Sequence, residues 1–327
     1  MSSWQGKRVL VTGGDGFIGS HLVDRLLADG AAVRVLVHYT PSGRLGWLHG
    51  READVEILAG DVRDGERVLQ AVDGQEVVFH LAALIGIPYS YQSPESYVQT
   101  NVMGTYHVLN ASRRAGIERV VHTSTSEVYG TALTVPIDEA HPLQPQSPYS
   151  ATKIGADMLA ISFHRSFELP VAIVRPFNTY GPRQSTRAVI PSLLGQLFGE
   201  AERIRVGTVS PTRDFNYVSD TVNGFLAVAG ADRVTGEVVN IGSGREISIG
   251  DLIELLFEVT GQRKDIVVED ERIRPTGSEV HRLLCDNTRA REWAGWKPEV
   301  SLEEGLRATA DWVRHNLGEL KTDVYHV

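Results

Sequence analysis

The sequence of 327 residues has a single cysteine, Cys285, which lies in an apolar run. One cysteine excludes an intramolecular disulfide and a cysteine-rich metal site, so we expect a packing role for Cys285 and no bound metal. Long hydrophobic runs are missing as well: no segment approaches the roughly 18 uninterrupted apolar residues that a membrane helix needs. The polar segment 1–7 lacks the cleavage site of a secretory signal. We therefore expect a soluble, cytoplasmic protein with no membrane partner.

The sequence also lacks an excess of positive charge. Lys and Arg total 32 against 41 Asp and Glu, and the formal net charge is −9. A nucleic-acid partner requires a basic surface that displaces counterions from phosphates, so we expect none. Binding of a small anionic ligand remains possible, because a few well-placed arginines suffice for it.

Internal repeats, low-complexity tracts and long polar linkers are absent too. The first half alternates short Val-, Leu- and Ile-rich runs with longer segments of helical period, which is typical of a parallel sheet covered by helices on both faces. This pattern predicts an α/β fold, a Rossmann-type doubly wound parallel sheet with a smaller C-terminal α/β lobe. The expected strands are 8–12, 32–38, 55–59, 76–80, 119–124 and 171–175, and helices open near residues 16, 64, 94 and 148.

After Pro176 the sequence changes to loops rich in Gly, Pro and Arg, with predicted helices at 189–198, 249–260 and 302–315. Residues 220–229 and 237–242 again resemble a helix and an apolar strand of the first domain. We therefore predict a first domain of residues 1–178 plus about 215–242, and a second lobe of residues 179–214 and 243–327.

A glycine-rich turn follows the first expected strand. Gly13, Gly16 and Gly19 are spaced for a tight turn, close approach of the backbone to a pyrophosphate and close packing of helix on sheet. Phe17 and Ile18 open the helix whose N-terminus would face the anion. The turn predicts a dinucleotide cofactor.

The acid that would hold a ribose 2′-hydroxyl is missing from the end of the second strand, where the sequence reads Val37-His38-Tyr39. His38, Ser42 and Arg44 could instead meet the 2′-phosphate of NADP. The residues alone therefore leave NAD and NADP open.

Further cofactor candidates follow the next strands. Asp61 could accept a hydrogen bond from the adenine amino group, with Val62 beside it, although a helix N-cap is the alternative role for Asp61. The small residues of Leu81-Ala82-Ala83 would let ribose and nicotinamide lie against the backbone. Asn101, a polar residue in a helical segment, could reach back to that loop.

Tyr149 and Lys153 are four residues apart, on one face of an expected helix. An ammonium group beside a phenol favours the phenolate, so Tyr149 could take a proton from a hydroxyl while the same carbon loses hydride to a nicotinamide. Together with the glycine turn, this pair predicts an oxidoreductase step.

The segment Thr125-Ser126-Glu127 follows the strand 119–124, at the edge of the sheet where open α/β folds bind ligands. Thr125 could donate a hydrogen bond to the hydroxyl being oxidised. Glu127 could remove an acidified proton next to a new ketone and then assist the loss of water. A capping or surface-turn role is the alternative for Glu127.

These motifs together resemble the extended short-chain dehydrogenase/reductases along nearly the whole chain. The resemblance implies a nucleotide-diphosphate sugar as substrate. It also implies cofactor contacts from Thr123 and Pro176, and substrate contacts from Tyr89, Asn178, Arg213 and Arg274. The motifs that carry it are residues 12–19, 80–83, 149–153, 175–183 and 213–218.

Within that family, Thr125-Ser126-Glu127 is similar to the triplet of the nucleotide-sugar 4,6-dehydratases. Segments 147–157, 175–187 and 211–221 and the ending 321–325 look most like the legionaminic-acid-type UDP-N-acetylglucosamine 4,6-dehydratases. Those enzymes are described as NAD-dependent and also lack the acid after the second strand. The resemblance therefore favours NAD.

The implied reaction is an internal redox cycle: oxidation at C4, loss of water across C5 and C6, and reduction at C6. Ser126 departs from the dTDP-glucose pattern, which has aspartate as the acid there. Glu127 is thus expected to act as both base and acid.

Three alternatives stay open: a UDP-glucuronate decarboxylase, a nucleotide-sugar 4-epimerase of the same family, and a non-catalytic NAD(P)-binding regulator. The segments 94–115 and 148–167 resemble the helix pair that forms a dimer interface in relatives, which predicts a homodimer.

Overall fold

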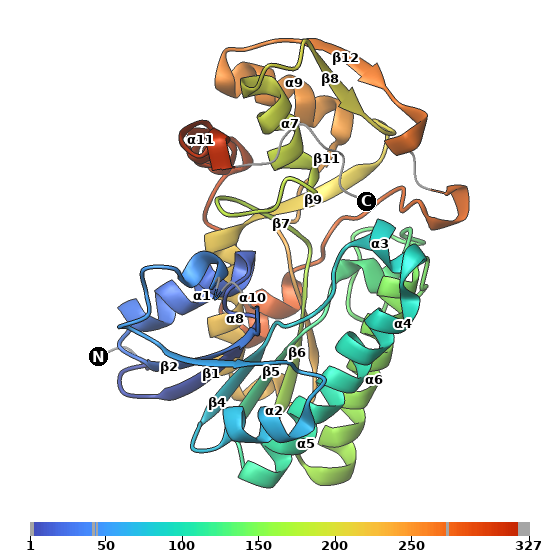
Figure 1. Cartoon of the computed structure of the whole chain (residues 1–327). Coiled ribbons are helices and arrows are strands. Elements are labelled where there is room, and N and C mark those ends of the chain that lie inside the picture. Colours follow the sequence, from blue (N-terminus) through green and yellow to red (C-terminus); the bar gives the residue numbers. More distant parts are fainter. Residues whose placement is uncertain (1–2, 41–42, 44, 273–274, 320–327) are drawn as a thin grey trace.

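The computed structural model describes residues 3–40, 43, 45–272 and 275–319. Its largest element is a seven-stranded parallel sheet with the order β10-β6-β5-β4-β1-β2-β3 (Figure 1). This arrangement confirms the predicted doubly wound α/β class. The strands of this sheet are β1 (Arg8–Thr12), β2 (Ala32–His38), β3 (Glu56–Gly60), β4 (Val77–His80), β5 (Arg119–Thr123), β6 (Val171–Pro176) and β10 (Val238–Ile241).

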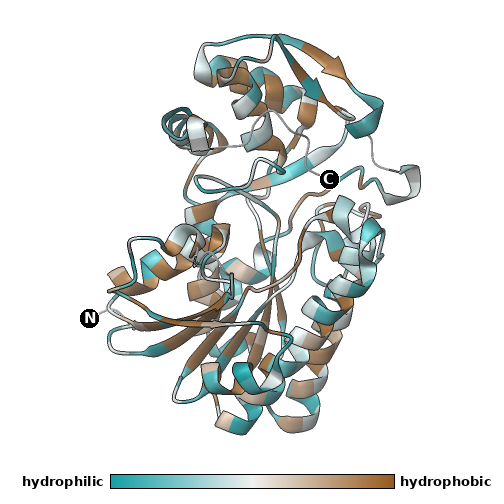
Figure 2. Cartoon of the chain, viewed as in Figure 1, coloured by the Kyte–Doolittle hydropathy of each residue, from teal (hydrophilic) through white to brown (hydrophobic). Residues whose placement is uncertain are grey.

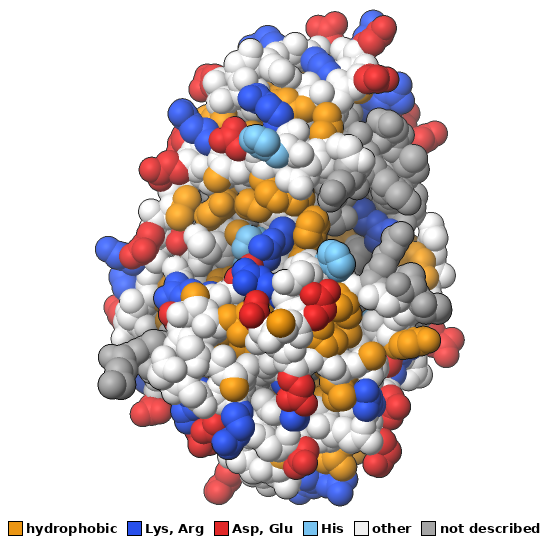
Figure 3. Space-filling model, turned by 60° about the vertical axis from the view of Figure 1, so that its left-hand side comes forward, with side chains coloured by type: hydrophobic (Ala, Val, Ile, Leu, Met, Phe, Trp, Pro, Cys, Tyr) orange, Lys and Arg blue, Asp and Glu red, His pale blue; other side chains and the backbone are white. Residues whose placement is uncertain are grey.

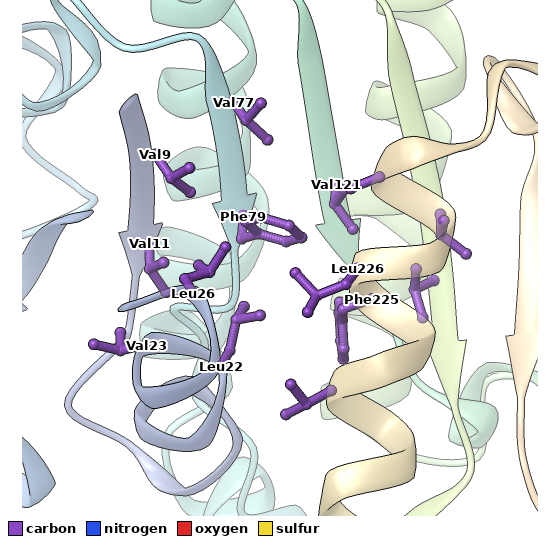
Figure 4. Packing of buried hydrophobic residues seen from close by; sticks show 14 of the residues in the cluster. Val9, Val11, Leu22, Val23, Leu26, Val77, Phe79, Val121, Phe225 and Leu226 are labelled. Atoms are coloured by element: carbon purple, nitrogen blue, oxygen red, sulfur yellow. The ribbon is translucent and has the colours of Figure 1, made fainter. Parts of the chain in front are cut away.

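Helices cover both faces of the sheet. On one face, α1 (Phe17–Ala28) and α8 (Val218–Gly230) pack against β1, β4 and β5, and Figure 4 shows Leu22 and Leu26 of α1 and Phe225 and Leu226 of α8 directed at Phe79 of β4. On the other face lie α2 (Gly65–Val72), α5 (Gly104–Ala115) and α6 (Pro148–Phe167). The apolar residues of the strands are therefore buried on both sides, and Figure 2 shows this sheet as predominantly hydrophobic.

A smaller group of elements has its own apolar core above the carboxyl ends of these strands (Figure 1). Its helices α7 (Val189–Phe198), α9 (Ile249–Thr260) and α11 (Leu302–His315) have the predicted bounds. Its short strands were not predicted: β7 (Asn178–Tyr180), β8 (Arg203–Val206), β9 (Thr212–Tyr217), β11 (Glu246–Ser248) and β12 (Asp265–Val268). Figure 3 shows hydrophobic side chains gathered across the middle of one face.

The chain passes repeatedly between the large sheet and the smaller group. It leaves after β6, returns for α8 and β10, and leaves again for β11, α9 and β12. It then returns a second time: Cys285 is buried in a cluster with Val128, and α10 (Thr288–Ala294) packs beside α8 and β10. The expected packing role of Cys285 is confirmed.

The predicted helix 94–115 is composite. It begins as α4 (Pro94–Tyr97), continues as a π-helical turn over Val98–Met103, and ends as α5. The separate helix α3 (Ile87–Gln92) precedes it. A π turn holds one residue more than an α turn, and here it contains the buried Asn101. Among the described residues, none of the helices has the length and hydrophobicity needed to span a membrane.

Candidate functional site

The glycine turn after β1 lies directly against the loop after β4. Gly13 has a φ of +70°, and a Cβ there would lie 2.9 Å from both the Cα and the nitrogen of Ala82. The φ value and the close approach both require glycine. The turn and the loop 81–83 are thereby brought together at the carboxyl edge of the sheet.

The N-terminus of α1 is open for an anion. The N-cap residue is Gly16, which has no side chain to accept hydrogen bonds from the N–H groups of the first helical turn. That turn begins with Phe17 and Ile18. The positive end of a helix beside a glycine turn is a ready anion site. The turn, the loop 81–83 and this helix start together fit the diphosphate of a dinucleotide.

The ends of β2 and β3 meet at His38 and Gly60, which are partners in the strand register. The Nδ1 atom of His38 lies 3.3 Å from Asp61 Oδ2, and Arg63 also binds Asp61, at 2.6 Å. Asp64, not Asp61, caps α2, because its carboxylate accepts hydrogen bonds from the N–H groups of Glu66 and Arg67. The N-cap alternative for Asp61 is therefore wrong. Arg44 lies outside the described residues.

Val62, next along the chain, is buried, and its carbonyl oxygen is 3.0 Å from Nδ1 of His107. Its side chain fills the space beside Gly104, where a Cβ would come within 2.8 Å of Val62 Cγ2. Val62 thus holds the loop after β3 against α5.

A buried chain of hydrogen bonds runs from β1 to α5 through His80. Thr105 donates its hydroxyl hydrogen to the Asn101 carbonyl oxygen (2.6 Å), so it accepts from Nε2 of His80 (3.1 Å). Nδ1 of His80 must then accept from the hydroxyl of Thr12 (2.8 Å), which in turn accepts from the Ala82 N–H (3.1 Å). Burial also holds the pKa of His80 well below its usual value. His80 is neutral and fixes the loop 81–83.

Asn101 joins the same loop to α6. Its Oδ1 accepts from the Leu84 N–H (2.8 Å), and its amide nitrogen donates to the Leu84 carbonyl oxygen (3.0 Å) and to the Thr152 hydroxyl (3.1 Å). Thr152 in turn donates to the main-chain carbonyl of Tyr149 (2.7 Å). The predicted cofactor loop and the predicted catalytic helix are therefore connected through one amide.

Tyr149 and Lys153 are both buried on the first turns of α6, which begins at Pro148 behind a capping box formed by Ser147 and Ser150. The Lys153 ammonium donates to the Thr123 carbonyl oxygen at the end of β5 (2.6 Å). Burial lowers the pKa of Lys153 to about 8, although Asp157 opposes this. A lysine in this state can both hold charge and release a proton near neutral pH.

Burial raises the pKa of the Tyr149 phenol, and hydrogen bonding with Thr125 opposes that rise. The negative charge of Glu127 also raises the pKa of Tyr149. Tyr97 packs edge-on against Tyr149 with ring centroids 6.3 Å apart. Tyr149 thus lies beside an aromatic ring and a hydroxyl.

The segment after β5 forms a short 3₁₀ turn over Ser126–Tyr129. Thr125 caps this turn, because its hydroxyl accepts from the Glu127 N–H (3.2 Å). The capping role is therefore that of Thr125 and not of Glu127. Ser126 is buried, whereas Glu127 is half-buried. The Thr123 hydroxyl is buried and has no hydrogen-bond partner among the described residues.

The predicted substrate residues approach from other elements. Tyr89 on α3 is exposed, with its ring 6.2 Å from that of Tyr97. Asn178 opens β7 and donates to the Asp214 carbonyl oxygen (3.5 Å). Arg213 on β9 is buried and pairs with Glu279 (3.2 Å). Arg274 lies outside the described residues.

The family model described as GDP-mannose 4,6 dehydratase matches residues 10–309. The chain belongs to this family. It is 38% identical to a UDP-glucose 4-epimerase of Mycolicibacterium smegmatis, over 94% of this chain and 99% of the relative. It is 31% identical to the dTDP-D-glucose 4,6-dehydratase of Mus musculus, over 96% and 91%.

Among solved structures, the dTDP-glucose 4,6-dehydratase DesIV of Streptomyces venezuelae, crystallised with NAD, superposes with a TM-score of 0.88 at 32% identity, covering 96% of this chain and 99% of that one. The resemblance to nucleotide-sugar short-chain dehydrogenase/reductases is therefore confirmed. The relatives named here include both dehydratases and an epimerase, so family membership leaves the activity open between the two.

In this member of the GDP-mannose 4,6-dehydratase family, a buried ionic network lies behind Lys153, and sequence analysis missed it. Asp157, one turn after Lys153, accepts from Nε (3.1 Å) and a terminal nitrogen (2.9 Å) of Arg175, and from the Ser124 hydroxyl (2.8 Å). His122 lies 3.3 Å from the other carboxylate oxygen. The four-residue spacing from Tyr149 to Lys153 to Asp157 was the available signal.

The network continues to the edge of the sheet. Arg175 donates to the Tyr129 hydroxyl (2.9 Å), which donates to Asn240 on β10 (2.7 Å). Burial raises the pKa of Tyr129 to about 12. Tyr129 therefore remains a neutral link between the active-site turn and β10. In the described part of the chain, no group of His, Cys, Asp and Glu gathers in a way that could hold a metal ion.

Proposed function

We propose that this protein is an NAD-dependent nucleotide-sugar 4,6-dehydratase, which makes a 4-keto-6-deoxy sugar nucleotide. The observation that carries the proposal is the position of Glu127. Glu127 is half-buried on the turn after β5, directly after Thr125 and Ser126, and the Thr125 hydroxyl that accepts from the Glu127 N–H also hydrogen-bonds with the Tyr149 phenol. An enzyme that only oxidises and reduces C4 needs no second base there, whereas elimination across C5 and C6 does.

The cofactor proposal rests on the cradle of Gly13, the loop 81–83 and the N-terminus of α1. Asp61 and Val62 would lie near the adenine. Thr123, whose hydroxyl has no hydrogen-bond partner in the described part of the chain, and Pro176 would lie near the nicotinamide. NAD would supply the acceptor for the C4 hydride and return that hydride at C6.

Tyr149 would take the proton of the C4 hydroxyl, and Thr125 would hold that hydroxyl in place. Lys153 would favour the phenolate through its charge, because an ammonium group in a buried site stabilises a nearby anion. The Lys153–Thr123 hydrogen bond supports this role by fixing the side chain at the end of β5.

Glu127 would remove the C5 proton after C4 has become a ketone, because without the ketone that proton is too weak an acid for a carboxylate. The same carboxyl group would then protonate the leaving C6 hydroxyl. Ser126 is buried and carries no acidic group. Glu127 would therefore carry out both the removal of the C5 proton and the protonation of the C6 hydroxyl.

The sugar nucleotide would lie between the large sheet and the smaller group of elements. Tyr89 is exposed beside the Tyr97–Tyr149 pair and could contact the sugar. Asn178 and Arg213, on the adjacent strands β7 and β9, could bind the diphosphate, with Arg274 near the nucleotide. Arg213 would have to share its charge with Glu279.

A 4-epimerase is the second candidate, because the chain is 38% identical to the Mycolicibacterium smegmatis epimerase. A UDP-glucuronate decarboxylase would share the first oxidation but release carbon dioxide. A non-catalytic regulator would not turn over any sugar nucleotide.

Incubation of the purified protein with UDP-, GDP-, CDP- and dTDP-hexoses, analysed by mass spectrometry, separates these candidates. A dehydratase product is lighter by one water, an epimerase product has unchanged mass and a new configuration at C4, and a decarboxylase acts on the glucuronate only. Epimerisation without water loss on every substrate would refute the dehydratase proposal.

We also propose a homodimer, formed through the faces of α5 and α6. Exposed apolar side chains gather along these helices and the preceding π turn: Val98, Met103, Tyr106, Met158 and Phe167. Tyr106 and Phe167 both pack against Phe163, so part of this surface is continuous from α5 to α6. The cytoplasmic location remains a prediction.

A further inference from the structure

The adenosine ribose of a dinucleotide needs a hydrogen-bond acceptor that β2 does not provide. In this fold a carboxylate after the second strand usually accepts from the ribose 2′-hydroxyl. Here β2 ends at His38, whose side chain is 66% exposed, and the next residue is Tyr39. The end of β2 therefore provides no carboxylate for this contact.

Asp15, in the glycine turn, lies next to the end of β2. Strands β1 and β2 are parallel neighbours with Thr12 opposite Leu36, so the turn that leaves β1 passes beside the last residues of β2. The Asp15 carbonyl oxygen accepts from the Trp47 N–H (3.1 Å). A Cβ on Gly46 would lie 3.2 Å from the Asp15 Cβ. The 46–48 turn thus holds Asp15 in place from the outer side.

Asp15 is half-buried on the turn that leaves β1, beside the end of β2 where the adenosine ribose would bind. Its carboxylate interacts electrostatically with the His38 imidazole, and burial raises its pKa. Asp61 also lies beside His38, but it belongs to the next strand outward and is bound by Arg63 through two nitrogens. Asp15 is the carboxylate on the turn that approaches the diphosphate.

We propose that Asp15 accepts hydrogen bonds from the ribose hydroxyls of NAD, in place of the missing β2 acid, and excludes the 2′-phosphate of NADP. This inference rests on the proposed NAD-binding function. A 2′-phosphate carries between one and two negative charges near neutral pH and would meet the carboxylates of both Asp15 and Asp61. A free hydroxyl, in contrast, donates to a carboxylate.

The test is the affinity of cofactor-free protein for NAD and for NADP, measured by calorimetry. Wild type is expected to bind NAD at least about tenfold more tightly than NADP, and Asp15→Asn should reduce this ratio by about tenfold, the value of one charge-assisted hydrogen bond. In Asp15→Asn/His38→Asp, which puts a carboxylate at the end of β2, the preference for NAD should return.

Asp64→Asn is the matched control. It removes the same charge at the same edge of the sheet, but asparagine still caps α2, so the ratio should stay at the wild-type value. An unchanged ratio in Asp15→Asn, or an equal change in Asp64→Asn, would overturn the assignment of Asp15. Wild-type protein that binds neither cofactor would instead overturn the proposed function.

Discussion

Lys153 donates its hydrogen bond to the Thr123 carbonyl oxygen, 2.6 Å away, and thereby joins the catalytic helix α6 to the carboxyl end of β5. The contact fixes a buried ammonium at the edge of the sheet where Thr125 and Glu127 follow. The hydrogen bond to Thr123 fixes the position of the Lys153 side chain, and burial lowers its pKa. The pH dependence of the reaction should therefore report on Lys153.

We expect kcat/KM to fall as pH rises through about 8, because burial lowers the pKa of Lys153 to about 8 and the charged ammonium exists only below its pKa. Asp157 opposes this lowering, so Asp157→Asn should move the fall to lower pH. Of the other groups near Lys153, burial lowers the pKa of both His80 and His122, and Arg175 is paired with Asp157. Rate profiles of both proteins on either side of pH 8 provide the measurement, and superimposable profiles would contradict the assignment.

Glu127→Gln should lower the dehydration rate by at least about 10²-fold, because a positioned general base contributes about 10²–10⁴-fold. Binding of NAD and of the nucleotide should be retained, and oxidation at C4 should still occur. The absorbance of the reduced cofactor would then accumulate in a single turnover. Glu118→Gln, at the opposite end of β5, makes the same charge change without touching the site and should behave as wild type. Normal turnover in Glu127→Gln would remove the elimination base from the proposal.

Gly13→Ala should weaken NAD binding by at least about tenfold, since its Cβ would lie 2.9 Å from the Ala82 backbone at a φ of +70°. Gly74→Ala is a close control, because Gly74 has a φ of +72° and no atom within 4 Å of its added Cβ. Fluorescence titration of NAD gives both affinities. Equal binding by the two variants would argue against contact between the glycine turn and the cofactor.

Arg175→Met should lower the free energy of unfolding by about 3–5 kcal/mol, because it leaves the buried Asp157 without its cationic partner. The exposed pair of Arg25 and Asp29 offers the comparison, and Arg25→Met should lower it by less than about 1 kcal/mol. Urea unfolding followed by circular dichroism measures both. A similar small loss in the two variants would mean that the buried pair contributes little.

Met158→Lys should convert the proposed dimer to a monomer, because it places a charge among the exposed apolar residues of α5 and α6. Val268→Lys, on β12 of the smaller group, changes another exposed apolar residue and should leave the mass unchanged. Light scattering after gel filtration gives the masses. A monomeric wild type at micromolar concentration would refute the dimer.

The larger sheet could be predicted because its strands are continuous apolar runs separated by helices of clear period, as in Val9 to Val11 and in Val171 to Val174. The short strands of the smaller group could not. β7 and β11 have three residues each, too few for an alternating pattern to stand out from a loop. The π turn at Asn101 was also hidden, because one added residue in a helix leaves the apolar spacing nearly unchanged.

The candidate site shows a similar division. Tyr149, Lys153 and Glu127 could be found from spacing and position after a strand, but their buried support could not. Arg175 inside an apolar strand signals a buried ion pair, and the four-residue spacing places Asp157 on the same face of the helix as Lys153, but neither signal alone pairs Arg175 with Asp157 among the 41 acidic residues. Only the packing of α6 on β6 brings the two together.

The repeated passage of the chain between the large sheet and the smaller group has a mechanical consequence. No single cut separates the protein into two pieces that each keep a complete core: a fragment ending after β6 would lack β10 at its sheet edge and α8 on its face. Rigid rotation of one part about the other would have to bend several connecting segments at once. We therefore expect substrate to enter by displacement of surface loops, and the separately expressed parts not to recombine into an active protein.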